Sequence, residues 1–422
     1  MKKPLTTLHD LVRALPPVMN IISHDVQDHH QKVAYLSCVI AEEMGLSEQE
    51  RLLTLGGAML HDVGGILREG AITLEDIEQD AAALAQAGAA LLGGHPVTRF
   101  FADVVRHSQT PWRSAAPSLR TLLRARPVLI GQIVHLADTV ALLLEPDKPV
   151  LNQVDHIRQC VEGAGDREYH PDVRKAFDAV SRREGVWLDM LYRPERFLDF
   201  LPDDRWVTLE EALQYTDIIS RLIDFRSPFT AMHSAGVAAT AEALARLAGM
   251  CAEECLMMRM AGNLHDIGKL KIPREILEKP GKLTDEEFNV MKEHAYFSYV
   301  ILREIRGFDQ IAVWAAFHHE KLNGAGYPFH LKADEIPLGA RIMAVADVFS
   351  AITEDRPYRK GMDPDKARAV LRGDAAKGAL SGELVELLIA NFDAINAARD
   401  EAAHAAGQRY YAAMEKEDAQ AK

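Results

Sequence analysis

Apolar residues recur three and four positions apart along most of the chain, the spacing that gathers them on one face of an α-helix. The pattern is clearest in five segments: 31–44, 236–248, 253–264, 285–304 and 380–397. Runs of alternating β-branched residues, which would indicate strands, are missing from the sequence. Thr284 and Glu287 have the spacing of a capping box and predict a helix start. We therefore predict an all-α protein.

One apolar run, from Val128 to Leu144, is long, but Gln132, His135 and Asp138 interrupt it. Polar residues at this density predict a buried helix and argue against a membrane span. The amino terminus lacks an apolar core followed by a small-residue cleavage site. We therefore expect a cytoplasmic protein without a signal peptide.

The first half of the chain contains a divergent repeat of the second half. In each half a histidine precedes a His-Asp doublet by 32 residues, and an aspartate follows in a similar apolar segment. The paired positions are His29 with His233, His61-Asp62 with His265-Asp266, and Asp138 with Asp347. Agreement at this spacing across otherwise unlike residues indicates a duplication.

The first copy lacks several polar groups of the second. The replacements are Ala83 for His294, His107-Ser108 for the doublet His318-His319, and Gly65 for Lys269. The groups that remain form a possible N-terminal metal site: His29, His61, Asp62 and Asp138. A structural domain with leftover polar residues is an equally good interpretation of this half.

Composition narrows the class of partner. The 422 residues carry a formal charge of −14, which argues against binding of duplex nucleic acid by counterion release. A small anionic ligand remains compatible, provided that metals and local cations reverse the field at its site. The four cysteines show no CxxC spacing, so we expect free thiols in a reducing compartment.

The second half concentrates metal-binding side chains within 115 residues. The seven groups are His233, His265, Asp266, His294, His318, His319 and Asp347. Imidazole and carboxylate suit borderline divalent ions, and two adjacent doublets exceed the needs of one ion. We expect Gly268 to end a helix just past the first doublet, so that both side chains converge. Because paired metals stabilise in-line attack at phosphorus, this half is interpreted as a dinuclear metal phosphohydrolase.

Cations follow two of these ligand groups. Lys269 follows the first doublet, and Arg356, Arg359 and Lys360 follow Asp347. A solvated basic cluster is the default interpretation of such residues. Cations that converge on a dimetal centre would also bind a phosphodiester with two negative phosphates.

Residues 226–360 resemble the HD-GYP domain, a subgroup of the HD phosphohydrolases, and the first half resembles a plain HD domain. The matching segments are RSPFTAMHSAGV, HDIGKLKIP, KEHAYFSYVIL, HHEKLNGAGYP and ADVFSAITEDRPYRK. The resemblance implies two tandem HD-type helical domains and hydrolysis of cyclic di-GMP to linear pGpG or GMP. Some relatives prefer 3′,3′-cyclic GMP-AMP. The expected limits are 1–162 for the divergent HD-like domain, 163–205 for a helical linker, 206–400 for the catalytic domain and 401–422 for a polar helical tail.

By the same resemblance, each residue of the motifs has an expected role. One ion would be held by His233, His265, Asp266 and Asp347, and the second by His294, His318 and His319, with Asp266 bridging. Lys269 would contact substrate phosphate and assist the leaving group, Arg356 and Arg359 would bind phosphate, and Tyr327 would border the substrate pocket. The ions are expected to be Fe or Mn, with Ni or Zn as alternatives.

Two departures from the family pattern qualify these expectations. Some relatives carry a glutamate four residues before the first histidine and hold a third metal, whereas this chain has Phe229, so we expect two ions. The loop usually reads DGxGYP, and Asn323 replaces its aspartate.

Three functions are weighed. The leading hypothesis is a dimetal cyclic-dinucleotide phosphodiesterase. The second is a non-catalytic adaptor that binds diguanylate cyclase (GGDEF) proteins through the GYP loop, against which the complete ligand set argues. The third is a phosphohydrolase for other nucleotides or phosphomonoesters, which the GYP loop and the RPYR segment disfavour.

Overall fold

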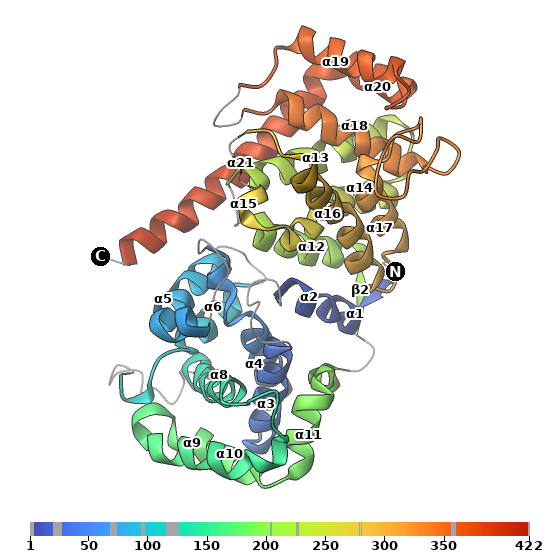
Figure 1. Ribbon diagram of the computed structural model, residues 1–422. Helices are drawn as coiled ribbons and strands as arrows, with labels where there is room; N and C mark the ends of the chain where they lie inside the picture. The colour runs from blue at the N-terminus through green and yellow to red at the C-terminus, as the bar shows by residue number, and fades with distance from the viewer. Residues whose placement is uncertain are drawn as a thin grey trace. The chain divides into compact units, whose positions relative to one another are not determined.

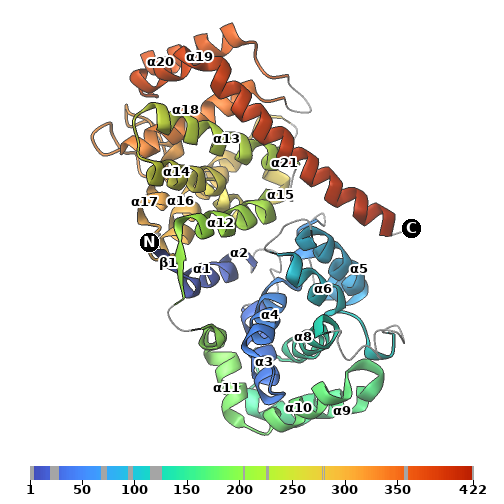
Figure 2. The same cartoon turned by 180° about the vertical axis from the view of Figure 1, so that it is seen from behind.

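A computed structural model of the protein describes residues 4–19, 28–67, 74–93, 98–114, 126–202, 205–224, 228–277, 279, 281–355 and 360–420. Within these ranges the chain is predominantly helical, which confirms the predicted all-α class. Its contacts divide it into two compact units, one of residues 15–204 with 413–422 and the other of residues 1–14 with 205–412. Figures 1 and 2 show both units from opposite sides.

The N-terminal unit is built around α3, α4, α6 and α8, which pack on one another. Its helices are α2 (Leu15–Met19), α3 (His29–Glu43), α4 (Glu48–Leu60), α5 (Leu74–Gly93), α6 (Arg99–His107), α8 (Arg126–Leu142), α9 (Val154–Glu168), α10 (Pro171–Ser181) and α11 (Glu184–Tyr192), with 3₁₀ segments η1 (Val63–Leu67), η2 (Trp112–Ser114), η3 (Val150–Asn152) and η4 (Pro194–Phe200). The segments α10, α11 and η4 pack against α3 and bury Phe177, Trp187 and Phe197.

The helix α8 covers most of the long apolar run. Its polar residues Gln132, His135 and Asp138 are all buried, which confirms the predicted buried helix. None of the helices in the part of the chain that the structure describes combines the length and apolar character needed to cross a membrane.

The C-terminal unit has α13 and α14 in close contact, with α18 against α13, and α12 and α17 against α14. Its elements are α1 (Leu8–Arg13), α12 (Leu209–Asp224), α13 (Pro228–Leu247), α14 (Ala252–Leu264), η5 (Ile267–Lys271), α15 (Arg274–Leu277), α16 (Asp285–Arg303), α17 (Asp309–Ala316), η6 (Phe317–His319), α18 (Leu338–Thr353), α19 (Pro364–Ala376), α20 (Gly382–Ala390) and α21 (Phe392–Gln420). The capping box of Thr284 and Glu287 starts α16, as predicted.

A two-stranded antiparallel sheet joins the two sequence segments of this unit (Figure 2). β1 (Pro4–Thr7) pairs with β2 (Trp206–Thr208), so that Thr6 lies opposite Val207. Strands this short carry too few residues for an alternating pattern to be recognised, and the sequence did not predict them.

Candidate metal centre

Both ligand doublets of the C-terminal unit lie at helix ends. α14 stops at Leu264, immediately before His265 and Asp266, and η6 follows α17 with His318 and His319. A Cβ added at Gly268 would lie 1.9 Å from the carbonyl oxygen of His294, so only glycine lets α16 approach this turn. The helix ends at Leu264, before the doublet, and not at Gly268 as expected. Gly268 lies within η5, where the absence of a side chain lets His294 approach the doublet.

The backbone fixes the tautomer of three of these histidines. The Nδ1 atoms of His265, His294 and His318 lie 2.7, 2.5 and 2.6 Å from the carbonyl oxygen three residues earlier. A carbonyl only accepts, so each Nδ1 carries the proton and donates it. The lone pair is then on Nε2, the nitrogen that faces the cluster.

Asp266 lies between two histidines and is buried. Its Oδ2 lies 3.2 Å from Nε2 of His265, and its Oδ1 lies 3.5 Å from Nε2 of His294. Oδ2 also accepts from the Lys269 ammonium. Two oxygens facing different imidazoles are the arrangement that a bridging carboxylate needs.

The remaining ligand candidates close around this carboxylate. Nε2 of His233 lies 3.1 Å from Oδ1 of Asp347, and the other oxygen of Asp347 lies 3.9 Å from Nδ1 of His319. The donor atoms fall into three overlapping groups, each within 4.8 Å: His294, His318 and His319; His233, His265 and Asp347; His265, Asp266 and His318. All seven candidates from the sequence are thus brought together.

Burial keeps two imidazoles of this cluster neutral. It lowers the pKa of His294 to about 4 and that of His319 to about 3, so both imidazoles are neutral, the form that binds a metal. Burial opposes the charge on Asp266, but His265 and Lys269 outweigh it and hold the pKa of this carboxyl well below its usual range.

Two donor atoms of the cluster show that the residues fit metal ions. Among the described residues, Nε2 of His265 and Oδ1 of Asp266 have no hydrogen-bond partner, although both are buried. Buried polar atoms without partners are costly, and divalent ions would satisfy them. Neutral imidazoles with carboxylates are a suitable donor set for Fe, Mn, Ni or Zn.

The expected substrate contacts are only partly within the described residues. The ring of Tyr327 lies 4.8 Å from the ring of His319, between centroids, so it borders the cluster. Arg356 and Arg359 lie outside the described residues, as does the side chain of Phe229. Asn323 fits its loop, because its Nδ2 donates to a backbone carbonyl at Lys377, a bond that an aspartate could not make.

Two glutamates that the sequence did not single out support the site. Glu354 accepts a hydrogen bond from Nδ1 of His233, at 2.9 Å. The buried Glu320 accepts from the backbone N–H groups of Phe329 and Leu331, at 2.7 and 3.0 Å, and so holds the loop beyond Tyr327. Glu354 is the first residue of the EDRPYRK segment and Glu320 the last residue of HHE. Their positions in these motifs could have indicated their roles.

Replacing Glu354 with glutamine should weaken metal retention. Carboxylates behind a metal-bound imidazole orient the ring and raise its basicity, and their loss typically costs about 10- to 100-fold in metal affinity or activity. Metal content after dialysis against graded chelator, with exposed Glu383→Gln as the matched control, measures the effect. Equal retention in both variants would contradict the role of Glu354.

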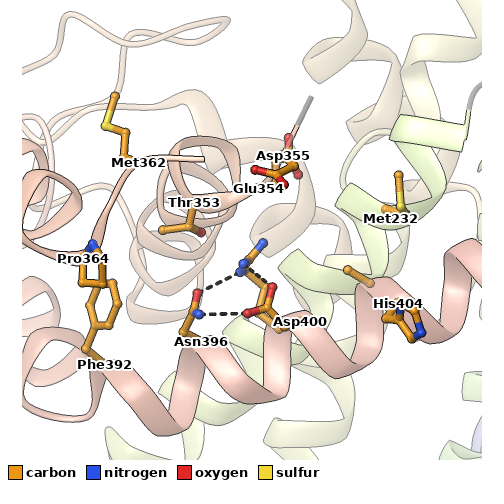
Figure 3. Close-up of a pocket in the computed structure, with 12 residues that line it drawn as sticks. Met232, Thr353, Glu354, Asp355, Met362, Pro364, Phe392, Asn396, Asp400 and His404 are labelled. Carbon is orange, nitrogen blue, oxygen red and sulfur yellow. Dashed lines mark hydrogen bonds and ion pairs between the residues drawn. The ribbon is translucent and has the colours of Figure 1, made fainter. Parts of the chain in front are cut away.

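A cavity of about 410 Å³ has Glu354 in its wall. Figure 3 shows Glu354 and Asp355 at its edge, and Asn396 and Asp400 on α21 below them. Arg399 is buried in its wall and donates to Asn396 and Asp400. The wall includes residues on both sides of 356–359, the segment that carries the two expected phosphate-binding arginines.

The N-terminal unit repeats the helix-end geometry. Nδ1 of His61 donates to the carbonyl of Ala58 at 2.7 Å, and a Cβ at Gly64 would lie 2.0 Å from the carbonyl oxygen of Leu84. This contact matches the one between Gly268 and His294. Leu84, and not Ala83, therefore occupies the position of His294, and the expected alignment was wrong by one residue.

Two family models match the chain, both described as the HD domain. One covers residues 26–143 and the other residues 217–382. Each range contains one of the His-Asp doublets with the histidine and aspartate that accompany it. The chain belongs to the HD family.

Relatives of known activity resemble this HD protein over different lengths. The 3′3′-cGAMP-specific phosphodiesterase 1 of Vibrio cholerae is 29% identical over 387 residues, which cover 88% of this chain and 89% of that protein. The cyclic di-GMP phosphodiesterase response regulator RpfG of Xanthomonas campestris is 42% identical over 155 residues, 36% of this chain and 41% of that protein. The C-terminal HD domain is of the HD-GYP type and is a cyclic-dinucleotide phosphodiesterase domain.

A solved structure supports the tandem arrangement of HD domains. The crystal structure of a cyclic GMP-AMP specific phosphodiesterase of Vibrio cholerae superposes with a TM-score of 0.61. It is 22% identical, and the match covers 92% of this chain and 98% of that one. At this identity the match shows the fold, two HD domains in tandem, as the sequence predicted.

Proposed function

We propose that the HD-GYP domain hydrolyses cyclic dinucleotides at two divalent ions and that 3′,3′-cyclic GMP-AMP is its preferred substrate. The observation that carries this preference is the similarity to the cGAMP-specific phosphodiesterase 1 along both HD domains. The match to the cyclic di-GMP phosphodiesterase response regulator RpfG covers 36% of the chain. The sequence analysis expected cyclic di-GMP as the substrate, with 3′,3′-cyclic GMP-AMP as the alternative, and the proposal now adopts the alternative.

The chemistry follows from the ligand cluster. Bound divalent ions would supply water activated at neutral pH and neutralise charge on the phosphate. The proposed ligands are the seven groups around Asp266, and this carboxylate, with one oxygen toward His265 and the other toward His294, is proposed to bridge. Lys269 is placed to donate a hydrogen bond near Asp266 and is proposed to stabilise the departing oxygen.

A competition assay tests the substrate. The full chain, loaded with Mn or Fe(II) without oxygen, is incubated with equimolar cyclic GMP-AMP, cyclic di-GMP and cyclic di-AMP, and the linear products are separated by chromatography. We expect kcat/KM for cyclic GMP-AMP to exceed that for cyclic di-GMP by about tenfold or more, a difference of ~1.4 kcal/mol in transition-state binding. A preference for cyclic di-GMP overturns the proposed selectivity. Binding of the dinucleotides without any linear product overturns the proposed hydrolysis and supports the non-catalytic adaptor hypothesis.

A further inference from the structure

We propose that Phe288 is a stacking platform for one purine of the substrate and that Lys292 contacts the phosphate that is not cleaved. This inference rests on the proposed hydrolysis of cyclic dinucleotides. Both residues lie on α16, the helix that also carries the ligand candidate His294. The sequence did not single out either of them. Together they would make the open edge of the metal centre a binding surface for a substrate with two bases and two phosphates.

The metal centre is open to solvent on the side of His319. The side chain of His319 is 28% exposed and is the most exposed of the seven ligand candidates, whereas that of His294 is 1% exposed. The ring of Tyr327 lies beside this opening, with its centroid 4.8 Å from that of His319 and 6.5 Å from that of His294. A substrate would therefore reach the ions by passing Tyr327.

Phe288 continues this series of ring contacts toward solvent. Its ring centroid lies 6.0 Å from that of Tyr327, with an angle of 85° between the two planes, which is an edge-to-face pair. Phe288 is 44% exposed, although it is large and apolar. A single exposed aromatic ring is ordinary on a protein surface, but this one stands at the approach to a site for a purine dinucleotide. Proteins bind unpaired bases by stacking them on such rings.

Lys292 adds a cation at the same place. It lies one helical turn beyond Phe288, and its Nζ is 5.5 Å from the centroid of the Phe288 ring. Among the described residues Lys292 forms no ion pair, whereas Lys279 is paired with Glu287 at 2.6 Å. In a chain with a formal charge of −14, a cation without a carboxylate partner is available to an anion. A lysine ammonium binds phosphate as a point charge.

The helix α16 holds this surface in a fixed position relative to the ligands. The hydroxyl of Ser298, on α16, donates to the carbonyl of His265 at 2.7 Å and accepts from the backbone N–H of Gly268 at 2.9 Å. Phe288 and Lys292 are therefore on the same rigid element as His294, and that element is hydrogen-bonded to the turn that carries the first doublet. A surface that is ordered before binding loses little entropy when a substrate arrives.

Steady-state kinetics of the metal-loaded full chain test this surface. Phe288→Ala should raise KM for cyclic GMP-AMP by about tenfold or more and leave kcat unchanged, because stacking holds the substrate and the transition state equally. Phe288→Leu, which keeps an apolar side chain without a ring, should show the same rise, and Phe288→Tyr should restore the wild-type KM. Tyr296→Ala removes another exposed ring from α16 and is the matched control that should keep it.

The second substitution tests the phosphate contact. Lys292→Gln should raise KM for cyclic GMP-AMP by about threefold and make KM less sensitive to salt, because an exposed ion pair is weak and screened. Lys366→Gln, whose side chain is 77% exposed on α19, is the matched control and should change neither quantity. A salt dependence of KM that is the same in Lys292→Gln as in wild type overturns this contact.

A small diester separates substrate binding from a structural role. Methyl 4-nitrophenyl phosphate has no purine and no second phosphate, so Phe288→Ala and Lys292→Gln should hydrolyse it at the wild-type rate. If Phe288→Ala slows both substrates alike, or leaves KM for cyclic GMP-AMP unchanged, the ring only supports Tyr327 or α16, and the stacking platform is overturned.

Equilibrium binding tests the inference alone if the wild-type chain hydrolyses no cyclic dinucleotide and the proposed function fails. Calorimetric titration of cyclic GMP-AMP into the metal-loaded chain should then give a Kd that Phe288→Ala raises by about tenfold and Tyr296→Ala leaves unchanged. An equal Kd in wild type and Phe288→Ala, or no binding to the wild-type chain, overturns the inference.

Discussion

Replacing Asp266 with alanine is expected to reduce cyclic-dinucleotide hydrolysis by about a thousand-fold or more. This carboxylate has one oxygen toward His265 and the other toward His294, so its loss removes a proposed ligand from both ions at once. Metal stabilisation of transition-state charge is worth several kcal/mol, and each ~1.4 kcal/mol is a factor of ten in rate. The measurement is single-turnover hydrolysis together with the metal content of the same sample.

The matched control for this substitution is Asp334→Ala, which removes an exposed carboxylate from the same unit. It should keep both the metal and the rate. Thermal unfolding of the two variants separates loss of the site from loss of the fold. An Asp266→Ala enzyme that turns over within a few-fold of wild type would rule out the bridging role.

Removal of the metal ions should abolish hydrolysis and leave the fold in place. Both ligand doublets lie at helix ends, and the unit has an apolar core that includes the buried Phe308 and Phe349, so its packing does not depend on the ions. We expect hydrolysis at background level after chelation and recovery when Mn or anaerobic Fe(II) is returned. A sample dialysed without chelator controls for handling losses, and the helical circular dichroism signal monitors the fold.

Residual hydrolysis at the wild-type rate in a sample with less than about a tenth of an equivalent of metal would contradict a metal-dependent mechanism. Recovery with one ion and not another would identify the ion that the reaction uses. Imidazole and carboxylate ligands bind several divalent ions, so this measurement is needed to identify the ion.

The ligand cluster was predictable because its members are neighbours in the sequence or recur at a fixed spacing. His265-Asp266 and His318-His319 are adjacent, and the doublet of each half follows its first histidine at the same interval. The position of the helix end was predicted less well, because the helix ends at Leu264 and not at Gly268. The same reasoning predicted the helical class, because packed helices require apolar residues on one face.

The supporting contacts were not predictable, because they join residues far apart in the chain. Glu354 meets His233 across 121 positions, and no periodic pattern marks such a pair. The register of Leu84 with His294 depends on how closely two helix backbones approach at a glycine, which a comparison of side-chain types does not detect.

The hydrogen bonds from Nδ1 of His265, His294 and His318 to the preceding helical turn have a kinetic consequence. Each ring is locked in orientation before any ion arrives, so loading requires little rearrangement of the chain. Exchange of one divalent ion for another should then alter the reaction through Lewis acidity alone, with the pocket's shape held constant by the helix ends.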